Sequence, residues 1–275
     1  MKTILITGCS SGIGQCVAHG LKKRGYRVFA TARQHKDVGI LQQNGFESCQ
    51  LDLDDSLSIH HAVDWVLAQT GGTLYALFNN GAYGQPGAVE DISRAALRAQ
   101  FETNLFGTHE LTCLLLPVMR RQGYGRIIQN SSVLGLVALP YRGAYVASKF
   151  ALEGLTDTLR LEWRNSGIHF SLIEPGPIQT AFRKNATQAF HRYVEIQTSV
   201  HQKIYLAMEE AFRQQAQQGG ARFSMPPEAV LGKVIHALES RHPRVHYGVT
   251  LPTHLFSVLR RILPRGILDI ILARA

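Results

Sequence analysis

The sequence lacks the features that mark membrane-spanning, disulfide-framework and zinc-binding chains. No run approaches the roughly 20 apolar residues that a transmembrane helix needs. The apolar start at 4–6 ends at Thr7-Gly8, too early for a signal peptide. The four cysteines are scattered without CxxC spacing, which favours reduced thiols in a cytoplasmic protein. No His/Cys cluster has zinc-ligand spacing, so we expect no metal.

Charged residues are also few, and the basic ones are unevenly placed. They make up 18% of the chain against 45% hydrophobic residues, a balance that supplies a large core and argues against disorder. The net charge is +9, yet residues 1–180 hold 16 basic and 14 acidic residues, whereas residues 181–275 hold 13 and 6. No basic run is interleaved with aromatic residues, so we expect no nucleic-acid partner. The basic last third favours an anionic surface or substrate.

Short β-rich runs alternate with helical periodicity along the first two thirds. The expected strands are 2–7, 27–31, 47–51, 74–78, 125–130 and 168–173, each bounded by Gly, Asn or Asp. The expected helices include 12–24, 56–69, 95–119 and 144–165. This alternation predicts an α/β fold with a single Rossmann-type, doubly wound parallel sheet and helices on both faces.

The regular alternation stops after Pro175. We expect residues 181–225 to form a helical insertion, 228–240 a helix and 245–249 a last strand, so that residues 1–250 make one domain. Residues 251–275 would be a C-terminal extension of two short amphipathic helices divided at Pro264, with apolar positions from Leu255 onward. The interleaved arginines are Arg260, Arg261, Arg265 and Arg274. The apolar faces would either pack on the domain or flank a pocket and meet membrane lipid at the inner face of a membrane; both interpretations stay open.

The turn after the first expected strand reads Thr-Gly-Cys-Ser-Ser-Gly-Ile-Gly at positions 7–14. Glycines let a backbone turn sharply beside a pyrophosphate, while free N–H groups and the helix dipole attract the anion. A GxxxGxG pattern can also be a plain strand–helix turn, but its place in a βαβ series favours a nucleotide. The expected cofactor contacts here are Gly8, Ser10, Ser11, Gly12, Ile13 and Gly14.

The second expected strand ends at Thr31-Ala32-Arg33. An NAD-binding fold usually places an acidic residue there for the ribose 2′-hydroxyl, whereas a nearby arginine accommodates a 2′-phosphate. Ala32 takes the acidic position and Arg33 follows it. A solvated surface arginine is the alternative, but the missing acid favours NADP(H).

Five further motifs complete a resemblance to the short-chain dehydrogenase/reductase family. After the turn at 7–14 come Asn-Asn-Gly-Ala at 79–82, Asn104, Ser132, YVASK at 145–149 and PGPIQT at 175–180. They stand in the family's order across residues 1–180, so residues 1–250 would be a Rossmann-fold oxidoreductase domain with a substrate-binding insertion at 181–225. The turn and the long tail look most like the branch of 17β-hydroxysteroid and retinol dehydrogenases and bacterial NADP-dependent aldehyde reductases.

Tyr145 and Lys149 are four residues apart, which puts both side chains on one face of a helix, where an ammonium can stabilise a phenolate. The resemblance implies that Tyr145 passes a proton to the carbonyl oxygen and that Lys149 also holds the nicotinamide ribose. It implies further that Ser132 stabilises charge on the same oxygen and that Asn104 holds a water linking Lys149 to solvent. A YxxxK pair alone would usually be a surface pair; the accompanying Ser and Asn favour catalysis.

The resemblance assigns further cofactor contacts with less specificity: Asp52 to the adenine amino group, Asn80 and Gly81 to the adenosine side, and Pro175, Gly176, Ile178 and Thr180 to the nicotinamide side. Asp52 could equally be a surface acid that ends a strand. The chain departs from the family at 81–82, where Gly-Ala replaces Ala-Gly. If the last position needs φ > 0, Ala82 would be strained by about 1 kcal/mol or more.

Five uncharged residues stand where the family lines its substrate pocket: Leu134, Val137, Leu139, Tyr141 and Phe182. Some of them would be core residues in the alternative interpretation. An uncharged pocket favours an apolar substrate. We therefore predict an NADP(H)-dependent oxidoreductase that interconverts an apolar alcohol and its aldehyde or ketone. The family's habit of pairing long helices predicts a homodimer or homotetramer.

Three other functions stay open. A 3-oxoacyl thioester reductase of the same family is one, although such chains generally end soon after the last strand. A non-catalytic NADP(H)-binding regulator is the second, although such proteins typically lose the Tyr or the Lys, and both stand here. A membrane-peripheral scaffold is suggested by the basic tail alone.

Overall fold

A six-stranded parallel sheet runs through the described part of the chain, residues 1–217 and 223–273 of a computed structural model. Its strands are β1 (Thr3–Ile6), β2 (Arg27–Ala30), β3 (Ala76–Asn79), β4 (Gly125–Asn130), β5 (Ile168–Glu174) and β6 (His246–Gly248). They lie in the order β2-β1-β3-β4-β5-β6, and every neighbouring pair is parallel. The order reverses direction at β1 and β3, so a ligand site is expected beyond the carboxyl ends of these strands.

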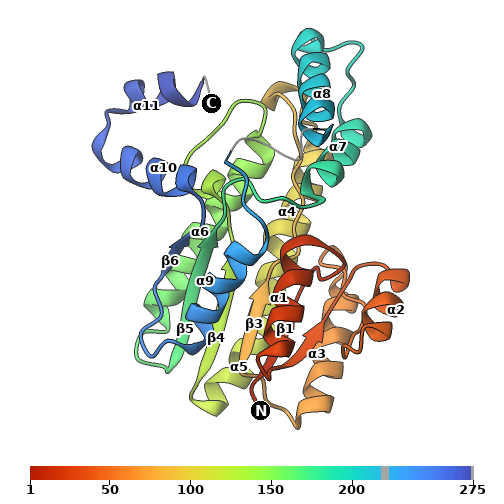
Figure 1. Cartoon of the computed structure of the whole chain (residues 1–275), viewed down its shortest axis with the longest axis vertical. Helices are drawn as coiled ribbons and strands as arrows, with labels where there is room; N and C mark the ends of the chain where they lie inside the picture. The colour runs from red at the N-terminus through yellow and green to blue at the C-terminus, as the bar shows by residue number, and fades with distance from the viewer. Residues whose placement is uncertain (218–222, 274–275) are drawn as a thin grey trace.

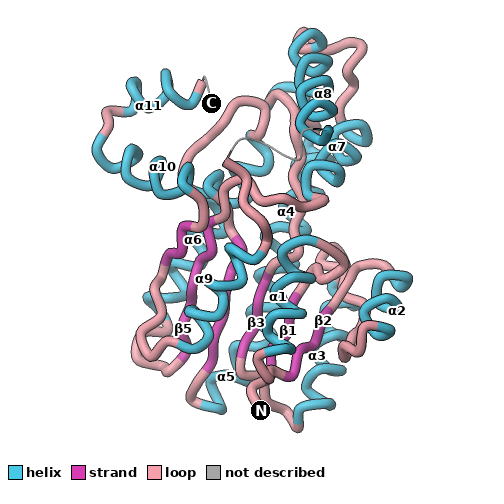
Figure 2. The backbone as a smooth tube through the Cα atoms, in the orientation of Figure 1, coloured by secondary structure: helices cyan, strands magenta, loops and turns pink. Residues whose placement is uncertain are grey.

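Helices cover both faces of this sheet (Figure 2), which confirms the predicted fold class. One face packs on α1 (Gly12–Lys23), α2 (His35–Gln43) and α9 (Glu228–Glu239). The other packs on α3 (Ser56–Thr70), α5 (Gly107–Gln122) and the C-terminal half of α6 (Gly143–Glu162). Strands buried on both sides explain the apolar runs without polar alternation.

Local signals set several helix ends. The side chain of Asp55 accepts a hydrogen bond from Leu57 N (3.0 Å) and caps α3, which ends at Gly71 in the left-handed conformation. α5 ends in the same way at Gly123. Side-chain caps satisfy the first backbone N–H groups and left-handed glycines let the chain leave the helix, so these residues decide where each helix starts or stops.

Residues 47–51 form no strand, which corrects one prediction from the sequence. They make isolated bridges instead, Phe29 with Glu47 and Ala32 with Gln50. The backbone hydrogen bonds to this segment, from Ala30 N to Glu47 O and from Leu51 N to Ala32 O, lie at its two ends and do not make a continuous ladder.

The single helix predicted over 95–119 is interrupted. α4 (Arg94–Phe101) passes into a π-helical turn, η2 (Glu102–Phe106), before α5 begins at Gly107. A Cβ at Gly107 would lie 1.9 Å from the Leu53 carbonyl oxygen, so only glycine fits here. The π turn re-aims the side chains of one helical turn, which is a feature common at functional sites. The sequence pattern does not predict α2, since its few apolar residues give a weak period.

The insertion is helical in its described part, with α7 (Phe182–Tyr193) and α8 (Gln202–Gln217); positions 218–222 lie outside the described residues. The tail forms α10 (Leu251–Ile262) and α11 (Arg265–Leu272), and the break at Leu263-Pro264 is as predicted. The first tail helix begins ahead of Leu255, and Arg274 lies outside the described residues. In Figure 1, α7–α8 and α10–α11 stand at the same end of the sheet.

Candidate active site

The turn between β1 and α1 has the shape expected for a phosphate-binding turn. Gly8 adopts a left-handed φ of +70°, and a Cβ at Gly14 would lie 2.3 Å from Gly8 O. Both positions therefore require glycine. The N-cap Ser11 makes no side-chain cap hydrogen bond, and the first turn of α1 holds no acidic residue. The helix thus offers its N–H groups and positive dipole end to an anion, which fits the phosphates of a nucleotide.

The ends of β1 and β3 are tied together directly beside that turn. Thr7 Oγ1 accepts hydrogen bonds from Asn80 N (2.9 Å) and Gly81 N (2.8 Å). The Asn80 amide donates to Thr7 O (2.9 Å) and Gly8 O (3.1 Å). Neither Gly81 nor Ala82 has a positive φ, so the strain considered for Ala82 does not arise.

Arg33 is exposed at the end of β2, and Ala32 before it is buried. Burial raises the pKa of the Asp54 carboxyl, and the charges of Arg33 and Arg192 oppose this rise. Two guanidinium groups, one after β2 and one from α7, therefore act on one carboxylate. Arg192 lies in the insertion without a motif of its own, so sequence analysis does not find it.

Asp52 is held in the loop before α3. Its Oδ1 accepts from Asp54 N (3.1 Å), and its own N–H donates to Ser58 Oγ (3.0 Å). Half-buried Asp52 thus organises this loop. These contacts favour the alternative interpretation of Asp52, in which it is a structural acid after residues 47–51 and does not contact the adenine.

Tyr145, Lys149 and Ser132 come together at the carboxyl end of β4. Tyr145 and Lys149 project from α6, and both are buried (8% and 2% exposed). The Lys149 ammonium donates to Asn130 O (2.7 Å) and lies 5.7 Å from the centre of the Tyr145 ring. Ser132 hydrogen-bonds to the Tyr145 side chain and accepts from Leu134 N (3.1 Å). Asn130, whose backbone orients the lysine, carries no sequence signal.

Asn104 lies in the π turn η2, and its amide is used by the protein itself. Its Oδ1 accepts from Tyr83 N (3.1 Å), while its Nδ2 donates to Tyr83 O (2.9 Å) and to Ser148 Oγ (3.2 Å). Ser148 Oγ in turn donates to Tyr145 O (2.8 Å). Asn104 therefore links the loop after β3 to the backbone of α6.

Burial shifts the pKa of both central groups. Desolvation raises the pKa of Tyr145 to about 12, although the Ser132 hydrogen bond opposes this shift. Desolvation lowers the pKa of Lys149 to about 8, although the charge of Glu153 opposes it. At neutral pH the phenol holds its proton and the amine is mostly charged, a state suited to proton donation.

Among the residues predicted for the nicotinamide side, Pro175 is buried, and Gly176 lies so close to Thr250 that a Cβ would meet its Oγ1 at 2.1 Å. Thr180 lies against the phosphate turn, since a Cβ at Gly12 would meet its Cβ at 3.0 Å. Ile178 forms a backbone bridge with Met225, at the end of the insertion.

The five candidate substrate residues separate into groups. Phe182 lies edge-on to Tyr145, with ring centres 5.5 Å apart, and half-buried Leu134 follows Ser132. Val137 and Leu139 pack with α11, so these two have a core role here. Tyr141, with a φ of 59°, packs against Tyr205 of α8. Among the described aromatic pairs, Phe182 is the candidate that contacts the Tyr145 ring.

Comparison with known proteins identifies the family of the chain. The short chain dehydrogenase family model matches residues 2–190, and the chain belongs to this family. It is 44% identical over 272 residues to YbbO of Escherichia coli K12, called an uncharacterized oxidoreductase, covering 98% of this chain and 94% of that protein. It is 34% identical to human 17-beta-hydroxysteroid dehydrogenase type 1, covering 90% and 77%.

Two solved structures share the fold. A short-chain dehydrogenase from Streptomyces avermitilis matches with a TM-score of 0.80 and 28% identity, covering 98% of this chain and 94% of that one. A single-residue variant of actinorhodin polyketide ketoreductase with NADPH matches with a TM-score of 0.73 and 27% identity, covering 90% and 95%. The chain is thus an oxidoreductase of the short-chain dehydrogenase family.

Proposed function

We propose that this protein reduces an apolar aldehyde or ketone with NADPH. The observation that carries the proposal is the buried group of Ser132, Tyr145 and Lys149 beside Phe182. A bound NADPH supplies the hydride. Tyr145 holds the proton that the carbonyl oxygen needs, Ser132 donates a hydrogen bond to the same oxygen, and Lys149 holds the ribose beside them. The raised pKa of Tyr145, about 12, keeps its phenol protonated at neutral pH, which favours reduction.

The preference for NADP(H) over NAD(H) rests on Arg33. Buried Ala32 offers no carboxylate to a ribose 2′-hydroxyl, and the exposed guanidinium next to it can pair with a 2′-phosphate. Arg192 acts on the same carboxylate, Asp54, so two cations influence this part of the site.

Phe182 supports an apolar substrate over a charged one, because its apolar ring lies edge-on to Tyr145. A 3-oxoacyl thioester is the second candidate, since its reacting carbonyl would use the same three groups. The regulator hypothesis loses weight because Tyr145 and Lys149 are both present and buried together.

We also propose that the tail helices touch an anionic membrane surface. Their inner faces pack on the domain, where Leu268 and Leu272 cluster with Val137. Their outer faces keep large apolar residues exposed, namely Leu251, Leu255, Val258, Ile262, Ile267 and Ile270. Arg260, Arg261 and Arg265 lie among them. In the part of the chain that the structure describes, no helix has the length and apolar content of a membrane span.

The free state of all four cysteines supports a reducing, cytoplasmic location. Association through α5 and α6 into a homodimer or homotetramer is a further proposal, supported by the exposure of Phe106, directly before α5, and of Leu161 in α6. Light scattering of purified protein tests the oligomer.

The function is tested by following NADPH oxidation with medium-chain aldehydes, retinal, steroid ketones and acyl thioesters. Turnover of an aldehyde or ketone supports the proposal. Turnover of acyl thioesters alone supports the second candidate, and binding of NADPH without turnover of the whole panel contradicts catalysis.

A further inference from the structure

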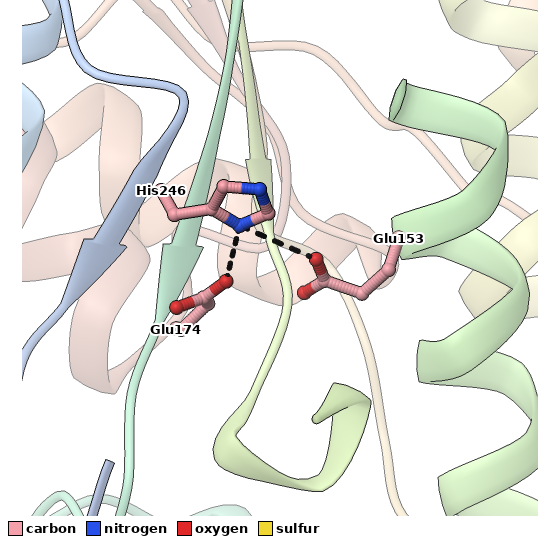
Figure 3. Close-up of side chains that lie close together, drawn as sticks. All are labelled: Glu153, Glu174 and His246. Atoms are coloured by element: carbon pink, nitrogen blue, oxygen red, sulfur yellow. Dashed lines mark hydrogen bonds and ion pairs between the residues drawn. The ribbon is translucent and has the colours of Figure 1, made fainter. Parts of the chain in front are cut away.

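Two buried carboxylates and an imidazole form a cluster between α6, β5 and β6 (Figure 3). Glu153 projects from α6, Glu174 is the last residue of β5, and His246 is the first of β6. His246 Nδ1 lies 2.6 Å from Glu174 Oε1 and 3.7 Å from Glu153 Oε2. The side chains of Glu153 and Glu174 are 10% and 4% exposed, whereas the His246 side chain is 42% exposed.

This cluster adjoins the segments that carry Lys149, Ser132 and Pro175. Glu153 follows Lys149 by four residues on α6, so the two side chains share one face of the helix. Its carboxyl group lies near the hydroxyl of Ser131, the neighbour of Ser132, which lowers the pKa of Glu153. Glu174 directly precedes Pro175 on the nicotinamide side.

The packing around Glu153 leaves no spare room. A Cβ at Gly135, in the short helix η3 (Val133–Gly135) after Ser132, would lie 3.0 Å from Glu153 Oε1 and 2.7 Å from Ser131 Oγ. Glycine at this position therefore lets the loop close over the carboxylate. Burying a carboxylate is costly unless a partner compensates it, so a group placed here needs an explanation.

We propose that Glu153 is a positioning residue for the catalytic lysine: anchored by the Glu174–His246 pair, it is the counter-charge that keeps buried Lys149 protonated. The inference rests on the proposed role of Lys149. Lys149 itself donates to a neutral carbonyl, that of Asn130, which does not compensate its charge. Burial lowers the pKa of Lys149, and Glu153 is the group that opposes this shift.

The charge on Glu153 depends in turn on its surroundings. Burial and the charges of Glu174 and Asp157 raise the pKa of Glu153 to about 7, while the Ser131 hydroxyl and His246 oppose the rise. The groups that face it are therefore Lys149 and Asp157 on its own helix, Glu174 on β5, His246 on β6 and the Ser131 hydroxyl. His246 is the solvent-exposed member of the cluster, so protons from solvent reach the cluster there.

The decisive variant is Glu153→Gln, which keeps the shape and removes the charge. The measured quantity is the pH dependence of NADPH affinity, determined by NADPH fluorescence. This measurement needs no turnover, so it tests the proposal even if the proposed reaction is wrong. Affinity should fall at high pH as Lys149 loses its charge, and in Glu153→Gln this fall should move about one pH unit lower. The kcat/KM profile for reduction should move with it.

Three companion variants make the result specific. Glu153→Asp keeps the charge, so its pH profile of NADPH affinity should stay close to that of the unmodified protein. His246→Gln should move the profile in the same direction as Glu153→Gln, but by less. Glu162→Gln, at an exposed position on the same helix, should leave the profile unchanged. His246→Gln still tests the proposal if Glu153→Gln does not fold.

An unmoved profile in Glu153→Gln with a lowered Tm would show a purely structural role and overturn the proposal. An equal shift in Glu162→Gln would do the same. Loss of NADPH affinity after EDTA treatment, restored by zinc, would show that the cluster holds a cation instead.

Discussion

Asn104 pairs with both backbone polar groups of Tyr83, accepting from its N–H at 3.1 Å and donating to its carbonyl at 2.9 Å. This two-point contact fixes the loop between β3 and α4 to the π turn. The side chain is thereby committed to protein groups, so its contribution includes shaping the site as well as any water that it holds.

We therefore expect Asn104→Asp to lose stability as well as activity. The carboxylate can still accept from Tyr83 N but leaves the Tyr83 carbonyl without this donor, at a cost of about 1–3 kcal/mol. Urea denaturation measures this cost, and Asn44→Asp, an exposed position at the end of α2, is the matched control. Unchanged stability with lost turnover would support a water-holding role alone.

Tyr145→Phe should lower kcat for carbonyl reduction about a hundredfold or more, because it removes the proton donor while keeping the ring that packs on Phe182. NADPH affinity should stay close to that of the unmodified protein. Lys149→Ala should reduce both affinity and kcat. Steady-state kinetics and NADPH fluorescence titration separate these effects, and ordinary turnover by Tyr145→Phe would show that another residue donates the proton.

Arg33→Ala should weaken NADPH binding about ten- to a hundredfold and leave NADH nearly untouched, since it removes a charge-assisted contact to the 2′-phosphate. Ala32→Asp should shift the preference towards NADH by supplying the missing carboxylate. Calorimetric titration with both cofactors measures the change. Equal use of NADH and NADPH by the unmodified protein would contradict the assignment.

The rate of reduction should be steady below neutral pH and fall as pH rises through about 8. The lowered pKa of Lys149, about 8, means that its charge is present below this pH and lost above it. Tyr145, with a pKa raised to about 12, keeps its proton across this range. Initial rates between about pH 6 and pH 10 provide the check, and a rate that rises through the alkaline half of this range would contradict the pairing of these two groups.

The membrane proposal predicts that the protein sediments with anionic vesicles at low salt and less at high salt, since each arginine near the surface adds about 1 kcal/mol that salt screens. Leu255→Asp with Ile262→Asp should abolish this binding, because both side chains are exposed. Deleting residues 254–275 is the harsher variant, as it also uncovers Val137. If vesicles do not retain the full chain at low salt, the tail serves packing alone.

Most of the fold follows from local pattern. Strands β4 and β5 are largely buried, so their sequences are apolar runs that can be predicted as strands without tertiary information. The segment at 47–51 also reads as a strand but lies outside the ladder, because continuous pairing depends on the path of the neighbouring chain. The π turn at Glu102–Phe106 has no sequence signature either. Gly107, which follows it, must be glycine because its backbone packs against Leu53, and this contact exists only in the folded chain.

The candidate catalytic residues and the candidate phosphate turn can be predicted from residue type and spacing, because a four-residue step on a helix and a glycine turn after a strand each have nearly one geometry. Residues distant in sequence need the folded chain. Glu153, Glu174 and His246 meet only because β5 and β6 pair and α6 packs across them. The four-residue spacing of Glu153 from Lys149 is visible in the sequence. The contact of Glu153 with the His246–Glu174 pair is decided by tertiary packing. Packing also sets the burial of each group in the site, and burial shifts its pKa.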